Sequence, residues 1–74
     1  MKKKLFAVAY RDRKGNWHDM ESIHASSSVM ARNIAFNRVS GLGIPGECEM
    51  HRVKPGKTIY EYDNGALYVE KVQS

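Results

Sequence analysis

The sequence predicts an α+β domain, an antiparallel sheet with one helix packed on one of its faces, in the order ββαβββ. Three observations lead to this fold class. Short apolar segments rich in β-favouring residues are separated by turns that contain glycine. One segment, 29–41, follows three serines and has apolar residues at helical spacing. The dipeptide Asn64–Gly65, typical of tight hairpins, lies between two further strand-like segments.

The length of 74 residues predicts a single domain over 1–74 with a thin core, in which the basic residues 1–4 are a candidate flexible segment. With 42% hydrophobic and 27% charged residues, the composition is that of a globular protein. The apolar run 5–10 is too short to span a membrane, so we expect no membrane partner. One cysteine, Cys48, cannot form an internal disulfide, and a reducing, cytoplasmic location fits this best.

The formal net charge of +4 is unevenly distributed along the chain. Residues 1–14 contain six basic residues and one acidic residue, whereas the remaining sixty contain six basic and seven acidic residues. The positive excess is therefore local in the sequence, at the N-terminus and the first turn.

A first hairpin is predicted, with strands over 5–11 and 17–25 joined by a turn that contains Gly15. If the turn pairs Asp12 with Trp17, this pairing sets the register of the whole hairpin. The pairs that follow are Ala9 with Met20, Ala7 with Ser22, and Phe6 with Ile23.

The helix is predicted over 29–41, capped by a serine of 26–28 and ended by Gly41. Its apolar stripe consists of Met30, Ala31, Ile34, Ala35, Val39 and Leu42, with Arg38 inside the stripe near the C-terminal end. The opposite side carries Arg32, Asn33 and Asn37, with Val29 and Phe36 beside them.

A strand over 47–53, a turn at 54–56 and a hairpin over 57–72 complete the predicted sheet. A two-residue turn at Asn64–Gly65 pairs Tyr62 with Leu67 and Tyr60 with Val69, all on one face. The other face carries Ile59, Glu61, Tyr68 and Glu70.

The first strand is apolar on both faces, whereas one helix covers only one face of a sheet. Because small side chains let a helix approach closely, we expect the helix over the face of Leu5, Ala7, Ala9 and Met20. The far face would then carry Phe6, Val8, Tyr10, Trp17 and Ile23. Three alternatives are open for its cover: the C-terminal hairpin, a second copy of the chain in a homodimer, or a different molecule.

These features predict a small non-enzymatic protein that acts by docking on another protein, as a regulator or inhibitor. Trp, Tyr and Arg dominate the energetics of protein interfaces, and the chain carries them close together. The predicted partner-binding residues are Phe6, Tyr10, Trp17, Arg32 and Phe36. Small size alone suggests a further hypothesis, an accessory factor of a phage or mobile element.

The alternative prediction is a nucleic-acid-binding module, because basic residues and rings are interleaved in the first hairpin. In proteins that bind single strands, cations contact phosphates and rings stack under bases. The basic residues are Lys2, Lys3, Lys4, Arg11, Arg13 and Lys14, and the stacking rings are Tyr10 and Trp17.

We expect no catalysis, no metal site and no cofactor. Cys48 and His51 are three residues apart in a predicted strand, so they point to opposite faces. His18 and His24 are six residues apart, too far for a pair of zinc ligands in an extended chain. A domain of this size also has little room to enclose a substrate pocket.

Overall fold

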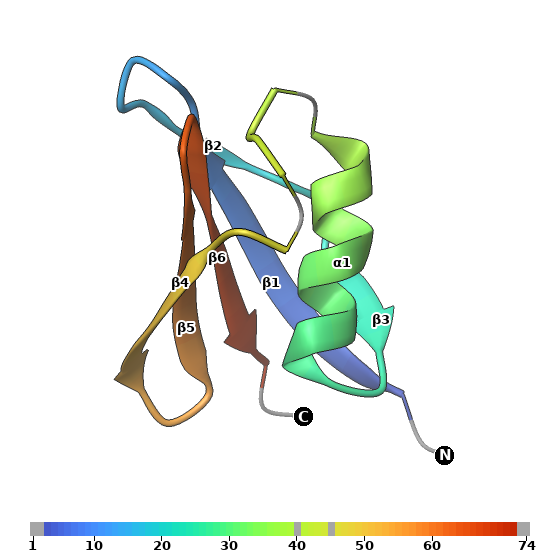
Figure 1. Ribbon diagram of the computed structural model, residues 1–74. Helices are drawn as coiled ribbons and strands as arrows, with labels where there is room; N and C mark the ends of the chain where they lie inside the picture. The colour runs from blue at the N-terminus through green and yellow to red at the C-terminus, as the bar shows by residue number, and fades with distance from the viewer. Residues whose placement is uncertain (1–2, 40, 45, 73–74) are drawn as a thin grey trace.

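The computed structural model describes residues 3–39, 41–44 and 46–72 (Figure 1). One antiparallel sheet contains all the strands, in the order β2-β1-β6-β5-β4, with β3 also paired with β1. In chain order the elements are β1 (Lys4–Arg11), β2 (Trp17–Asp19), β3 (Ile23–Ala25), α1 (Ser28–Arg38), β4 (Glu49–Lys54), β5 (Lys57–Tyr62) and β6 (Gly65–Lys71). The predicted fold class is confirmed, with the second predicted strand divided into β2 and β3.

Helix α1 covers only part of the sheet. It packs on β1, β3 and β6, while β4 and the turn that joins it to β5 extend beyond it (Figure 1). Every side chain of β4 is consequently exposed. The C-terminal hairpin does not fold over the sheet, because β6 pairs with β1 and β5 with β6, so both strands widen it. The first of the three alternatives for covering the second face is therefore wrong.

The helix is bounded by local hydrogen bonds. The Oγ atom of Ser27, the N-cap, accepts a hydrogen bond from the backbone N–H of Met30 at 3.2 Å. At the other end, the N–H of Val39 donates to the carbonyl of Phe36 at 3.3 Å, where the chain becomes extended. The helix is therefore shorter than the predicted 29–41 at its C-terminal end.

Helix α1 packs on the face opposite to the predicted one. Phe6 and Val8 are 3% and 4% exposed beneath it, and its own Ala31 and Ala35 are fully buried. The small residues that allow close approach are thus supplied by the helix, so the sheet can fill the space with large side chains. Of the residues expected under the helix, Leu5, Ala7 and Ala9 are only half-buried, on the other face, whereas Met20 packs against the core.

The register of the first hairpin changes between β2 and β3. Trp17 pairs with Arg11 rather than with Asp12, so the predicted register is wrong for β2. Ile23 pairs with Phe6, and the predicted register is confirmed for β3. Because a shift of one residue turns side chains to the other face, Trp17 and Ile23 lie on opposite faces of the sheet.

The hairpin of β5 and β6 differs from its predicted register by two residues. Tyr60 pairs with Leu67, and Tyr62 with Gly65, so the turn is formed by the residues at 63–64. A shift of two residues leaves each side chain on its face. The predicted division of the hairpin into two faces is therefore confirmed, and Tyr60, Leu67 and Val69 are almost completely buried.

The hydrophobic core lies between α1 and the sheet. Its members are Phe6, Val8, Ile23, Ala25, Ala31, Ala35, Leu42, Tyr60, Tyr62, Leu67 and Val69. The hydroxyl of Tyr62 is buried and has no hydrogen-bond partner among the described residues. Burial, with a smaller contribution from nearby Cys48, raises the pKa of Tyr62 to about 12.

Gly65 lies where two backbones approach closely. A Cβ atom there would overlap the carbonyl oxygen of Arg11 and lie 2.7 Å from Cδ2 of Leu42. We expect Gly65→Ala to lower the free energy of unfolding, measured by urea denaturation, by about 1–3 kcal/mol, as overpacking does elsewhere. Gly46→Ala is the control, since no atom lies within 4 Å of its added Cβ. Equal stability of the two variants would contradict this packing.

Candidate docking face

The sheet surface opposite α1 is called the open face here. It consists of Leu5, Ala7, Ala9, Arg11, Trp17, Asp19, Lys57, Ile59, Glu61, Ala66, Tyr68 and Glu70, placed on one side by the register of β2, β1, β6 and β5. Its central row runs from Ile59 through Tyr68 to Ala9, each opposite the next on a neighbouring strand. Within the described ranges, no helix or strand packs over it.

The centre of the open face is apolar and shallow. Leu5, Ala7, Ala9, Ile59 and Tyr68 are all half-buried, although within the described part of the chain only their neighbours in the sheet cover them. The alanines are short and Tyr68 is long, so the surface is uneven. A hollow of about 470 Å³ adjoins this centre, lined by Ala7, Pro55, Lys57, Glu70, Lys71 and Val72.

Charged pairs flank the apolar centre on two sides. On one side Nζ of Lys57 lies 3.4 Å from Oε2 of Glu70, and Oε1 of the same carboxylate accepts a hydrogen bond of 2.8 Å from the Tyr68 hydroxyl. The Tyr68 hydroxyl, and to a lesser extent Lys57, lower the pKa of Glu70. Partial burial and the bond to Glu70 raise the pKa of Tyr68. These contacts hold the Tyr68 ring in place on the face.

The second flank combines an ion pair with a cation–π contact. Nη1 of Arg11 lies 3.8 Å from a carboxylate oxygen of Glu61, and its guanidinium carbon is 5.9 Å from the centre of the Trp17 ring. Trp17 remains 48% exposed. An exposed ion pair contributes little to stability, so this arrangement matters more for the shape and charge of the surface than for the fold.

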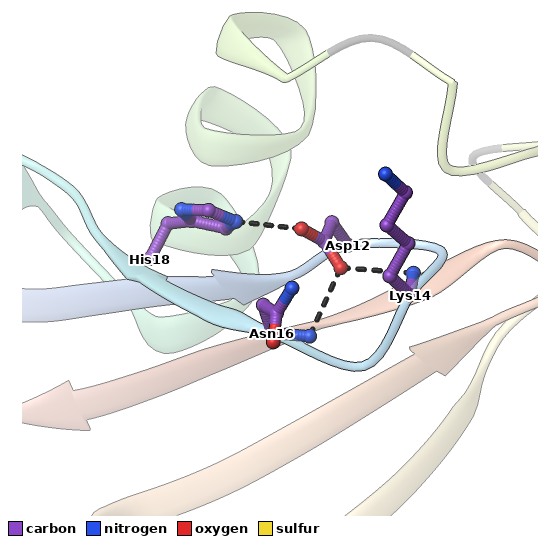
Figure 2. A network of polar contacts seen from close by, with 4 residues as sticks. All are labelled: Asp12, Lys14, Asn16 and His18. Atoms are coloured by element: carbon purple, nitrogen blue, oxygen red, sulfur yellow. Dashed lines mark hydrogen bonds and ion pairs between the residues drawn. The ribbon is translucent and has the colours of Figure 1, made fainter.

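The turn between β1 and β2 is organised by Asp12, as Figure 2 shows. One carboxylate oxygen accepts hydrogen bonds from the backbone N–H groups of Lys14 and Asn16, both at 2.9 Å, and the other lies 2.7 Å from Nε2 of His18. Gly15, at φ +90°, allows the chain to reverse. The hydrogen bond with His18, followed by that from Asn16, lowers the pKa of Asp12. The His18–Asp12 pair thus has a structural role in shaping the turn.

The sheet divides the aromatic residues predicted to form one partner-binding surface. Phe6 lies in the core, and Tyr10 lies on the same side, half-buried and stacked on the ring of His18 with centroids 4.7 Å apart. Trp17 lies on the open face. The prediction that these three share an uncovered face is therefore wrong, because of the one-residue change of register and the choice of face by the helix.

Arg32 and Phe36 lie where α1 meets the C-terminal hairpin. The Phe36 ring packs on Tyr62, with centroids 5.0 Å apart, and the Arg32 guanidinium lies 5.1 Å from the centre of the Tyr60 ring. Nη1 of Arg32 also donates to Sγ of Cys48 at 3.8 Å. Both side chains are half-buried, so they help to hold the helix on the sheet.

The basic residues proposed for nucleic-acid binding do not form one surface. Lys3 and Lys4 lie at the start of β1, whereas Arg11, Arg13 and Lys14 lie at and after its end. Lys4 and Arg11 are the two ends of this strand of eight residues, about 23 Å apart at the usual rise per residue. Lys2 lies outside the described residues. Tyr10 is stacked on His18, and Trp17 lies beneath Arg11. Neither ring lies beside Lys4.

No three histidine, cysteine or acidic side chains in the described ranges are placed to share a metal ion. His51 lies 3.4 Å from Glu49, and Cys48 is half-buried beside Arg32. Among the described residues, no helix is both long and apolar enough to cross a bilayer.

No protein-family model matches the chain. No curated protein matches it, and no solved structure does so either. The function is therefore inferred from the geometry and charge of this molecule.

The contact between His18 and Asp12 has a pH signature. Because the pKa of Asp12 is lowered in the folded state, its contribution to stability is present above the unfolded pKa and is lost as the pH falls through the folded value. We expect His18→Ala to raise the pKa of Asp12 towards the ordinary value, as followed by NMR titration of the carboxyl carbon. His24→Ala, in β3, is the control and should leave that pKa unchanged. The same pKa in both variants would show that His18 is not the main cause.

Proposed function

We propose that this chain is a non-enzymatic interaction protein that docks on another protein through the open face. The observation that supports this most directly is the apolar centre, in which Leu5, Ala7, Ala9, Ile59 and Tyr68 are adjacent and uncovered by any described helix or strand. Contiguous apolar surface on a small protein commonly marks an interaction site.

The composition of the open face favours a protein as its partner. Protein interfaces combine an apolar centre with a polar rim, and are enriched in Tyr, Trp and Arg. Here Tyr68 lies in the centre, and Trp17 with Arg11 lies on the rim. The two ion pairs keep their charges at the periphery, where water still reaches them. A protein that binds in this way without chemistry of its own suits a regulator or an inhibitor.

Substituting Ala9 tests the proposal directly, because this small residue lies in the central row. Ala9→Arg would place a long charged side chain where the partner packs, without touching the core beneath α1. We expect it to abolish capture of the partner from a nuclease-treated lysate of the source cells, read by mass spectrometry. The thermal midpoint should change little.

Asn37→Arg is the matched control, since it adds the same charge on the exposed side of α1. It should capture the partner as the native chain does. Val29→Arg, also on the exposed side of the helix, tests the competing surface. Loss of capture with Val29→Arg but not with Ala9→Arg would overturn the proposal.

Light scattering shows whether the partner on the open face is a second copy of this chain. If the native chain is a dimer and Ala9→Arg makes it a monomer, the open face is the interface of a homodimer.

A further inference from the structure

Lysines that are distant in the sequence converge at one end of the sheet. Four adjacent strands each contribute one: Lys54 from β4, Lys57 from β5, Lys71 from β6 and Lys4 from β1. With Lys3, which precedes β1, these residues are called the lysine end. At the usual spacing between strands, the four strands extend over about 14 Å.

Backbone pairing places these lysines next to one another. Lys54 lies opposite Lys57, and the N–H of Lys71 donates to the carbonyl of Gly56, in the turn that joins them, at 2.8 Å. Lys71 also lies opposite Phe6, two residues along β1 from Lys4, so Lys4 and Lys71 are diagonal neighbours on one face. The convergence is therefore a consequence of the strand order.

The lysine end carries a strong positive charge. Among the residues that the structure describes, Glu70 is the one carboxylate that strand pairing places beside these five lysines, and it pairs with Lys57. The acidic residues of the same hairpin gather at its opposite end, where a hollow is lined by Glu47, Glu49, Glu61 and Asp63 together with Cys48 and Tyr62. The hairpin of β4 and β5 is thus basic at its turn and acidic at its open end.

We propose that the lysine end binds the phosphodiester backbone of nucleic acid, a role distinct from protein docking on the open face, with which it shares Lys57. Lys54 and Lys57 project on the side of the open face, whereas Lys4 and Lys71 project on the side of α1. A protein lying flat on the open face would reach only half of them. A long, narrow polyanion that crosses the strand ends reaches all four.

The same geometry predicts binding without sequence preference. Lysine recognises phosphate as a point charge, without the paired donors that arginine uses to read bases. Trp17, an exposed ring suited to stacking, lies at the other end of β1 from Lys4. Affinity should therefore depend on phosphate contacts and fall steeply with added salt.

The test measures binding of the full chain to a labelled mixed-sequence duplex of about 20 base pairs by fluorescence anisotropy. In about 100 mM salt, charges more than about 10 Å apart are largely screened, so local contacts dominate. We expect the double variant Lys54→Glu, Lys71→Glu to bind at least about tenfold more weakly, with a salt slope smaller by about two. The double variant Arg13→Glu, Lys14→Glu, with the same change of net charge at the other end, should change affinity by less than about threefold.

Three results would overturn the proposal. They are equal loss in the two double variants, absence of duplex binding by the native chain, and binding to phosphatidylserine vesicles without retention of the duplex. Because all four substituted residues are exposed, we expect both double variants to fold, and their thermal midpoints check this. Ala9→Arg should leave duplex binding intact, so failure of the docking proposal and failure of this one are separable.

Discussion

The packing of Ala31 and Ala35 against the sheet is the contact on which the rest of the structure depends. These two residues are fully buried, and their small size brings the backbone of α1 close to β1, β3 and β6. The space between is filled by large side chains from the sheet, among them Phe6, Leu67 and Val69. Burying each such side chain contributes roughly 1.5–3 kcal/mol relative to leaving it exposed. In a domain of 74 residues, few other contacts of this size are available.

This packing decides which surface remains available for partners. Once α1 takes the side of Phe6 and Val8, the apolar residues on the reverse of β1 have no described helix or strand to cover them. The strand order adds a second consequence, because it brings the beginning of β1 beside the end of β6 and the turn between β4 and β5. The two proposed surfaces, one apolar and one basic, therefore follow from the position of the helix and from the order of the strands respectively.

Local patterns in the sequence were sufficient to predict the elements and the fold class. The division of the C-terminal hairpin into two faces was also predictable, because a two-residue error in the turn leaves Tyr60 and Leu67 on the same side. The side of β1 that the helix covers was not predictable from the strand, since its two faces are both apolar. The change of register between β2 and β3 was not predictable either, and it places Trp17 on the opposite face from Phe6. The grouping of Ile59 with Tyr68 was visible, but its continuity with Ala9 depends on β6 pairing with β1. The lysine end could not be found from the sequence either, because it also depends on which strands pair.

The side of the sheet that α1 covers is tested most directly by nuclear Overhauser effects from the methyl groups of Ala31 and Ala35. Because α1 covers the side of Phe6 and Val8, we expect cross-peaks from these methyl groups to core side chains such as Phe6 and Val69, and none to the methyl groups of Ala7 and Ala9. Cross-peaks to Ala7 or Ala9 would place the helix on the opposite face and contradict the account.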